Sequence, residues 1–240
     1  MKTYLSWLLP YTCILCHQPS QRRQDLCVDC LNNLPILSHP CPSCALPLPG
    51  DLQTPCGSCQ RQTPAFNKIH ALFTYQTPIT QLILQLKFHH QLIYARIFGE
   101  LLAEKIQCTW YRTTPLPNVI IPVPLHPSRL QKRGFNQALE IAKPLAKILR
   151  LPIDTQCCSR IKPTPQQITL SAEKRRHNLQ YAFQIHGDLS GMIVAIVDDV
   201  VTTGSTVQAL SATLKKHGAN AIHVWCCART AVTLPQKIAL

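Results

Sequence analysis

The sequence predicts an α/β domain with a mainly parallel sheet, preceded by a small cysteine-rich module. Two observations predict it: strand-like and helix-like patterns alternate from Lys68 onward, and four Cys-x-x-Cys pairs lie before residue 60. Such alternation is typical of a parallel sheet covered by helices. A length of 240 residues suits one medium domain with a small module. We expect the module to span residues 1–64 and the domain residues 65–240.

The thirteen cysteines are unevenly distributed. Eight of them form the four pairs: Cys13/Cys16, Cys27/Cys30, Cys41/Cys44 and Cys56/Cys59. Two thiolates in such a pair can face one centre, and two pairs make the tetrahedral sulfur cage that zinc prefers. Redox-active pairs are the alternative interpretation. The spacing leaves open two structural zinc sites in sequence order, two interleaved sites or a single occupied site, and His17 and His39 are possible substitute ligands.

The module is rich in proline, which suits turns better than helices, and it has little core of its own. Metal binding is therefore expected to supply its folding energy. No recognisable signal peptide precedes the cysteines, which favours zinc over disulfides. We expect a cytoplasmic protein, compatible with docking at the inner face of the inner membrane. The unpaired cysteines are expected to be buried small residues: Cys108, Cys157, Cys158, Cys226 and Cys227.

Hydrophobic periodicity places the elements of the domain in order. Strands are expected at residues 69–75, 119–123, 192–197 and 221–227, and helices at residues 77–88, 92–106, 136–149 and 205–217. Residues 171–183 suggest a basic helix or a structured loop. Pro144 is expected to kink or split its helix. Gly218 is placed to end the last helix.

The sharpest chemical pattern follows the apolar run 192–197. The strand is expected to end in Asp198 and Asp199, and a loop opening a helix follows: Thr202, Thr203, Gly204, Ser205 and Thr206. Ligands of open parallel sheets bind at the carboxyl ends of strands. Such a loop offers N–H groups and hydroxyls to a phosphate. The acids would repel that phosphate, so they are expected to face ribose hydroxyls or hydrated Mg²⁺. The implied ligand is a sugar phosphate.

This segment resembles the signature of the type I phosphoribosyltransferases, which bind phosphoribosyl pyrophosphate (PRPP). Other motifs narrow the resemblance to the ComF family of competence-associated proteins. They are the cysteine-rich start, Lys87-Phe88, Pro122 to His126, Arg129, Arg133 to Gln137, and the spaced residues Arg160, Thr164, Gln167, Leu170, Arg175, Asn178, Ala182 and Phe183. Together they cover essentially the whole chain.

The resemblance implies a phosphoribosyltransferase-like fold behind a zinc-binding module, PRPP with Mg²⁺ as ligand, and a role in DNA uptake during natural transformation. It implies that residues 202–206 hold the 5′-phosphate, while Asp198 and Asp199 lie on the ribose side. The turn after Val123 would supply backbone donors to the pyrophosphate. His126 is expected to have a packing or hydrogen-bonding role. Further positions of the family motif are Asn136, Gln167, Arg175 and Asn178.

The pyrophosphate group requires neutralisation by basic side chains, because it carries several negative charges. The candidates are Lys87, Arg129, Lys132 and Arg133. The formal net charge of +13 also favours a polyanionic partner.

Three functions remain open. In the first, the protein is a competence factor that handles single-stranded DNA and uses its PRPP site for binding or regulation. In the second, it is an active phosphoribosyltransferase with an unknown nucleophile. In the third, it is a zinc-module adaptor for a competence helicase or DNA-loading protein. We prefer the first, because both the family resemblance and the positive charge support it.

Overall fold

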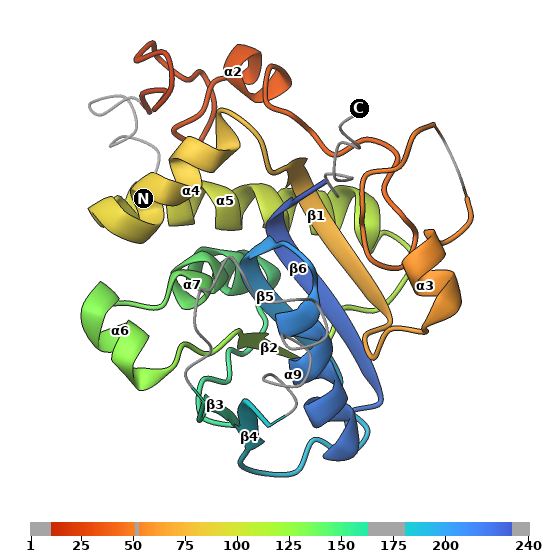
Figure 1. The fold of residues 1–240 in the computed structure, drawn as a ribbon. Helices are drawn as coiled ribbons and strands as arrows, with labels where there is room; N and C mark the ends of the chain where they lie inside the picture. The colour runs from red at the N-terminus through yellow and green to blue at the C-terminus, as the bar shows by residue number, and fades with distance from the viewer. Residues whose placement is uncertain (1–10, 51–52, 163–180, 232–240) are drawn as a thin grey trace, which may run out of the picture.

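The structure is a computed structural model that describes residues 11–50, 53–162 and 181–231. Its central sheet has four parallel strands in the order β1-β6-β5-β2 (Figure 1). These strands are β1 (Lys68–Thr74), β2 (Val119–Pro122), β5 (Ile193–Val201) and β6 (Ala221–Arg229). An antiparallel pair, β3 (Cys158–Arg160) and β4 (Phe183–Ile185), lies apart from this sheet. The predicted α/β class with a parallel sheet is confirmed.

Helices cover both faces of the sheet. On one face, α5 (Leu92–Lys105) packs against α7 (Gln137–Leu149) and α4 (Ile79–His89), and α9 (Ser205–Lys216) lies on the other face (Figure 1). Four shorter helical segments complete the described part: α2 (Val28–Asn32), α3 (Gly57–Arg61), the π-helix Ile106–Trp110 and α6 (Pro127–Arg133). Among the described residues, none of the helices has the length and apolar character needed to cross a membrane.

Helix α7 runs through Pro144 without a break, so the predicted split of this helix is wrong. A proline in a helix interior removes a hydrogen bond and costs about 3 kcal/mol. The ring of Pro144 packs closely on α5, because a Cβ atom at Gly99 would lie 2.5 Å from Pro144 Cγ and 2.4 Å from Ile141 O. Glycine at position 99 lets the two helices approach, and their packing offsets the lost hydrogen bond.

Two further expectations need correction. Strand β5 continues to Val201, so Asp198 and Asp199 lie within the strand rather than at its end. Asp198 still pairs in register with Cys226 of β6, which is why the strand continues past the first acid. Cys108 is exposed, whereas the other four unpaired cysteines are buried as expected.

The cysteine-rich segment wraps around the β1 edge of the sheet (Figure 1). Residues 35–37 run along this edge, where the N–H of Leu37 donates to the carbonyl of Leu72 at 2.9 Å. The part before this crossing joins the core on the α5 side through Leu26, and the part after it joins the core on the α9 side through Cys44. The segment therefore covers an edge that would otherwise expose unpaired backbone groups.

Candidate functional site

The eight paired cysteines form two clusters in sequence order. The first comprises Cys13, Cys16, Cys27 and Cys30, and the second comprises Cys41, Cys44, Cys56 and Cys59. In each cluster the four sulfur atoms lie within 4.8 Å of one another. Within the described chain the interleaved alternative is therefore wrong, and neither cluster includes His17 or His39.

The distances between sulfur atoms suit zinc. Four sulfurs placed tetrahedrally about 2.3 Å from Zn²⁺ would lie about 3.8 Å from one another. Cys16 Sγ and Cys27 Sγ are 3.8 Å apart, and Cys44 Sγ and Cys56 Sγ are 3.7 Å apart. A backbone N–H group also supports the second cage, since Cys56 N donates to Cys41 Sγ at 3.2 Å. Both clusters have the donor set and the size of a structural zinc centre.

The thiols within each cluster differ in acidity. Burial raises the pKa of Cys13, but hydrogen bonds from backbone N–H groups outweigh burial and lower this pKa to about 6. The same opposing effects lower the pKa of Cys41 to about 7. Burial and neighbouring thiols raise the pKa of Cys30 and of Cys59. Because zinc binds thiolates, metal binding must release protons from the less acidic members of each cluster.

The loop after β5 forms an open cradle at the start of α9. Gly204 has a φ of 79°, in the left-handed region that favours glycine, and directly precedes the helix. Thr203 Oγ1 lies 2.8 Å from Ser205 Oγ and accepts from Ser205 N at 3.3 Å. Thr202 and Thr203 are exposed, and Thr206 is half-buried. The loop therefore gathers hydroxyls where helix N–H groups favour an anion.

The two acids of β5 have different surroundings, although both are nearly buried. Asp199 forms an ion pair with Lys87 of α4. Asp198 accepts a hydrogen bond from the N–H of Asp199 at 2.9 Å. Burial and, secondly, the charge of Asp199 raise the pKa of Asp198 well above its usual value. A bound cation would therefore stabilise the charged form of Asp198 more than that of Asp199, which already has Lys87 as its partner.

The four predicted cations lie on α4 and at α6. Lys87 contacts Asp199 directly, and the charge of Asp199 acts on half-buried Arg133. Burial lowers the pKa of Arg133, whereas the charge of Asp199 raises it and the charge of Arg129 lowers it. Lys132 is exposed on the same short helix. The structure thus places Lys87 at Asp199. Arg133 Nη1 donates to Gln137 Oε1 at 2.6 Å, and Lys132 stays at the surface.

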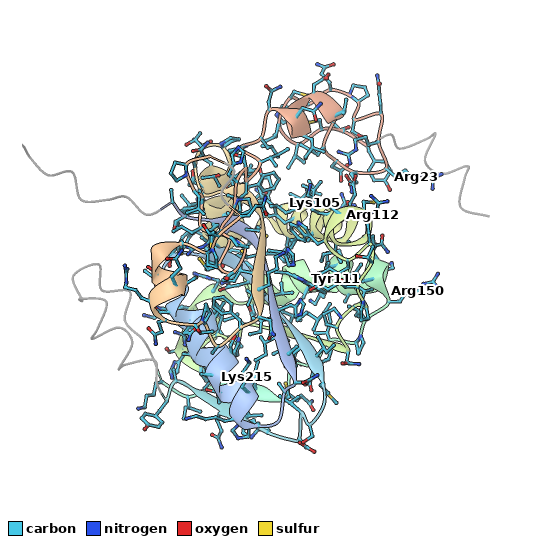
Figure 2. The ribbon with its side chains drawn as sticks, turned by 90° about the vertical axis from the view of Figure 1, so that its right-hand side faces the viewer. Arg23, Lys105, Tyr111, Arg112, Arg150 and Lys215 are labelled. Carbon is cyan, nitrogen blue, oxygen red and sulfur yellow. The ribbon has the colours of Figure 1, made fainter. Side chains whose placement is uncertain are left out.

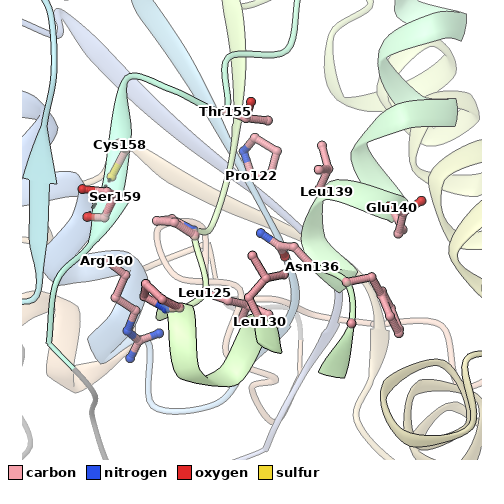
Figure 3. Close-up of a pocket in the computed structure, with 14 residues that line it drawn as sticks. Pro122, Leu125, Leu130, Asn136, Leu139, Glu140, Thr155, Cys158, Ser159 and Arg160 are labelled. Atoms are coloured by element: carbon pink, nitrogen blue, oxygen red, sulfur yellow. Dashed lines mark hydrogen bonds between the residues drawn. The ribbon is translucent and has the colours of Figure 1, made fainter. Parts of the chain in front are cut away.

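A pocket of about 480 Å³ lies beside the turn after β2 (Figure 3). Prolines and leucines form much of its wall, while Asn136 and Arg160 contribute polar groups. Asn136 Nδ2 donates to the carbonyl of Val123 at 3.0 Å, and Asn136 Oδ1 accepts from Ala138 N at 3.0 Å. Asn136 therefore ties this turn to the start of α7. Arg160 is buried, with its guanidinium carbon 5.5 Å from the centre of the Phe183 ring.

Five predicted motif residues fall outside the described part of the chain: Thr164, Gln167, Leu170, Arg175 and Asn178. Most of the segment 171–183, expected as a basic helix or a structured loop, also lies outside it. Their roles stay predictions. His126 Nδ1 accepts from Ser128 N at 3.3 Å and caps α6. This contact agrees with the hydrogen-bonding role expected of His126.

Arg229 is a buried residue that the sequence analysis missed. It ends β6, and its Nη1 donates to the carbonyl of Val201 at 3.0 Å, just before the loop of residues 202–206. The only available signal was an arginine at the end of a mostly apolar strand.

The parallel sheet, the loop at the end of β5 and the two cysteine cages define a class: a type I phosphoribosyltransferase fold with an N-terminal double zinc ribbon. The sequence matches the family described as "Double zinc ribbon domain" over residues 4–60. It matches the family described as "Phosphoribosyl transferase domain" over residues 136–238. The predicted structural zinc sites and fold are confirmed at this level.

Relatives that match most of the chain identify its family within this class. The chain is 36% identical over 224 residues to the DNA utilization protein YhgH of Salmonella typhi, covering 92% of this chain and 98% of that protein. It is 37% identical over 178 residues to Competence protein F of Haemophilus influenzae, covering 72% and 78%. It is 25% identical over 208 residues to Competence protein ComFC of Bacillus subtilis, covering 81% and 80%. The chain belongs to the ComF family.

Proposed function

We propose that this protein binds PRPP together with Mg²⁺ at the carboxyl ends of β2 and β5. The observation that carries the proposal is the meeting of the buried acids Asp198 and Asp199 with Lys87, next to the loop of residues 202–206. In this proposal the loop binds the 5′-phosphate and the acids face the ribose hydroxyls. Bound Mg²⁺ neutralises part of the pyrophosphate charge. The remaining charge is neutralised by Lys87, Arg129, Lys132 and Arg133.

Calorimetric titration of Mg²⁺–PRPP tests this binding. We expect saturable heat with the wild type and at least tenfold weaker binding with Asp198→Asn/Asp199→Asn. Asp188→Asn is the matched control, because Asp188 is an exposed carboxylate that bonds to Ser190. The absence of saturable heat with the wild type would refute PRPP binding.

We further propose that the protein acts in DNA uptake and handles single-stranded DNA. Support comes from the relatives called DNA utilization and competence proteins, and from the net charge of +13. Four exposed basic residues lie in the right-hand half of Figure 2: Arg23, Lys105, Arg112 and Arg150. An ion pair of 3.1 Å between Arg22 and Glu104 holds the first zinc ribbon near the end of α5. A competence helicase or DNA-loading protein is the protein partner that we propose.

Fluorescence anisotropy of labelled oligo(dT) at increasing KCl tests the contact with DNA. Each phosphate neutralised should contribute about −0.7 to the slope of log K against log salt. We expect Lys105→Glu/Arg112→Glu to weaken binding at least tenfold and to flatten this slope. Lys215→Glu/Lys216→Glu makes the same charge change on α9, away from this group in Figure 2, and should weaken binding much less. Equal losses, or no binding at low salt, would contradict the proposal.

The pocket beside the turn after β2 favours a second candidate, transfer of ribose 5-phosphate to a nucleophile. Such transfer needs a positioned acceptor near the site that binds PRPP. Pyrophosphate release from PRPP, stimulated by an added nucleobase and lost in Asp198→Asn/Asp199→Asn, would establish turnover. Release that no nucleobase stimulates would argue against this class of acceptor.

A further inference from the structure

Arg229 joins two parts of the molecule that are distant in sequence. Its guanidinium group is nearly buried, with 4% of the residue exposed. Arg229 Nε donates to the carbonyl of Cys44 at 3.0 Å, and Arg229 Nη1 donates to the carbonyl of Val201 at 3.0 Å. The same Nη1 also contacts the carbonyl of Thr202. One side chain therefore spans the distance from a cysteine of the second cluster to Thr202, the first residue of the proposed phosphate loop (residues 202–206).

The neighbours of Arg229 restrict its freedom. Thr230 Oγ1 donates to the carbonyl of Thr202 at 3.1 Å, and Thr230 N donates to the carbonyl of Val201 at 3.2 Å. A guanidinium group is planar and presents its donors in a fixed arrangement, so its acceptors must keep a fixed relative position. A shift of the Cys44 carbonyl would leave a buried cation short of a partner. The loop carbonyls would then have to move, or the charge would become less well solvated.

The first cluster is attached differently. Its segment packs on the α5 side, where Arg22 pairs with Glu104 at 3.1 Å and Asp25 pairs with Arg96. The two clusters therefore have different connections, although both have the geometry of a zinc cage.

We propose that Arg229 is a positioning residue that couples the second zinc centre to the phosphate loop, so that zinc bound there favours PRPP binding. This inference rests on the proposed PRPP function. Coupling between two sites is reciprocal, so PRPP must also strengthen zinc retention by the same factor. In this proposal, zinc in the first cluster has no such effect on PRPP binding.

Cysteine variants of the full chain test the coupling. Cys59→Ser and Cys30→Ser form a matched pair, because each removes the last ligand of its cluster and both residues are partly buried in a short helix. We expect Cys59→Ser to weaken Mg²⁺–PRPP binding at least tenfold in calorimetry, and Cys30→Ser to change it less than twofold. Equal effects of the two variants, or no effect of Cys59→Ser, would overturn the coupling.

Arg229→Lys keeps the charge but removes the planar fork. We expect this variant to retain two zinc ions by elemental analysis, yet to bind PRPP at least fivefold more weakly. If Arg229→Lys fails to fold, the comparison of Cys59→Ser with Cys30→Ser still tests the coupling. Wild-type affinity in a folded Arg229→Lys protein would overturn the positioning role.

Hydrogen exchange of the amides of residues 202–206 is measured without any ligand. We expect faster exchange in Cys59→Ser and in Arg229→Lys than in Cys30→Ser. This measurement separates the two proposals. Failure of the wild type to bind PRPP would refute the proposed function, while exchange in residues 202–206 would still test whether the second zinc centre positions this loop. Unchanged loop exchange in Cys59→Ser and Arg229→Lys would refute the coupling alone.

Discussion

Asp198 and Asp199 are adjacent in one strand, yet their carboxylates have different electrostatic surroundings. Asp199 has Lys87 as its ion-pair partner, whereas burial and the charge of Asp199 raise the pKa of Asp198. The sequence predicted both acids at the site, but it placed them at the very end of the strand. Charged residues are rarely buried within strands, so the local pattern alone favours a strand that ends at the two acids. The pairing of Asp198 with Cys226 depends on tertiary structure.

Asp198→Asn is expected to stabilise the ligand-free protein at neutral pH, because the variant removes a carboxylate whose charged form is disfavoured by burial. The raised pKa means that the contribution of Asp198 to stability is present below its unfolded value of 3.8 and is lost as pH rises through the folded value. The difference between variant and wild type in urea unfolding should therefore grow from pH 4.5 to pH 7.5.

Asp188→Asn supplies a control of opposite sign. Hydrogen bonds from Ser190 lower the pKa of Asp188, so its contribution is present above the unfolded value and is lost in acid. This variant should be less stable than the wild type at pH 7.5, with a smaller difference in acid. A loss of stability in Asp198→Asn at pH 7.5 would count against the assigned burial effect.

Helices and strands with a clear hydrophobic periodicity were predictable from the sequence. Short strands, and features that depend on tertiary contacts, were not. The strand at 119–123 and the helix at 205–217 correspond to β2 and α9. Strands β3 and β4 have three residues each, which is too short for a periodic pattern. The continuity of α7 depends on how Pro144 packs against Gly99 of α5. The periodicity of a single helix does not reveal its contact with another helix, so this contact could not be predicted.

Gly99→Ala is expected to destabilise the fold by about 2–3 kcal/mol, because overpacking forces two tightly packed helices apart. The added Cβ would lie 2.4 Å from Ile141 O and 2.5 Å from Pro144 Cγ. Gly57→Ala in α3 is the control, since its Cβ would meet only Arg61 Nη1 at 3.5 Å. Urea unfolding of both variants measures the difference. Equal stabilities would show that the α5–α7 contact is looser than described.

At the scale of the whole molecule, the zinc ribbons and the sheet share their cores. Cys13 and Leu26 belong to the core on the α5 side, while Cys41 and Cys44 belong to the core on the α9 side. The CxxC spacing predicted the ligands but left their pairing open, because pairing depends on how the chain passes the β1 edge. The division at residue 64 stays a prediction, based on the change in composition along the chain.

Removal of zinc is therefore expected to affect the sheet as well as the ribbons. Elemental analysis should find two zinc ions per chain, and chelation should lower the thermal midpoint and speed hydrogen exchange in β1. The physical reason is that residues 35–37 cover the β1 edge between the two cages. Chelation that releases two zinc ions without altering β1 exchange would show that the ribbons contribute little to the sheet.

The most direct test of the central claim is hydrogen exchange of the full chain with and without Mg²⁺–PRPP. We predict protection in residues 198–206 and in the segment from Val123 to Arg133, because these surround the proposed phosphate and ribose sites. Ribose 5-phosphate alone should protect only residues 198–206. Protection confined to other parts of the chain, or no protection at saturating PRPP, would contradict a PRPP site at the carboxyl ends of β2 and β5.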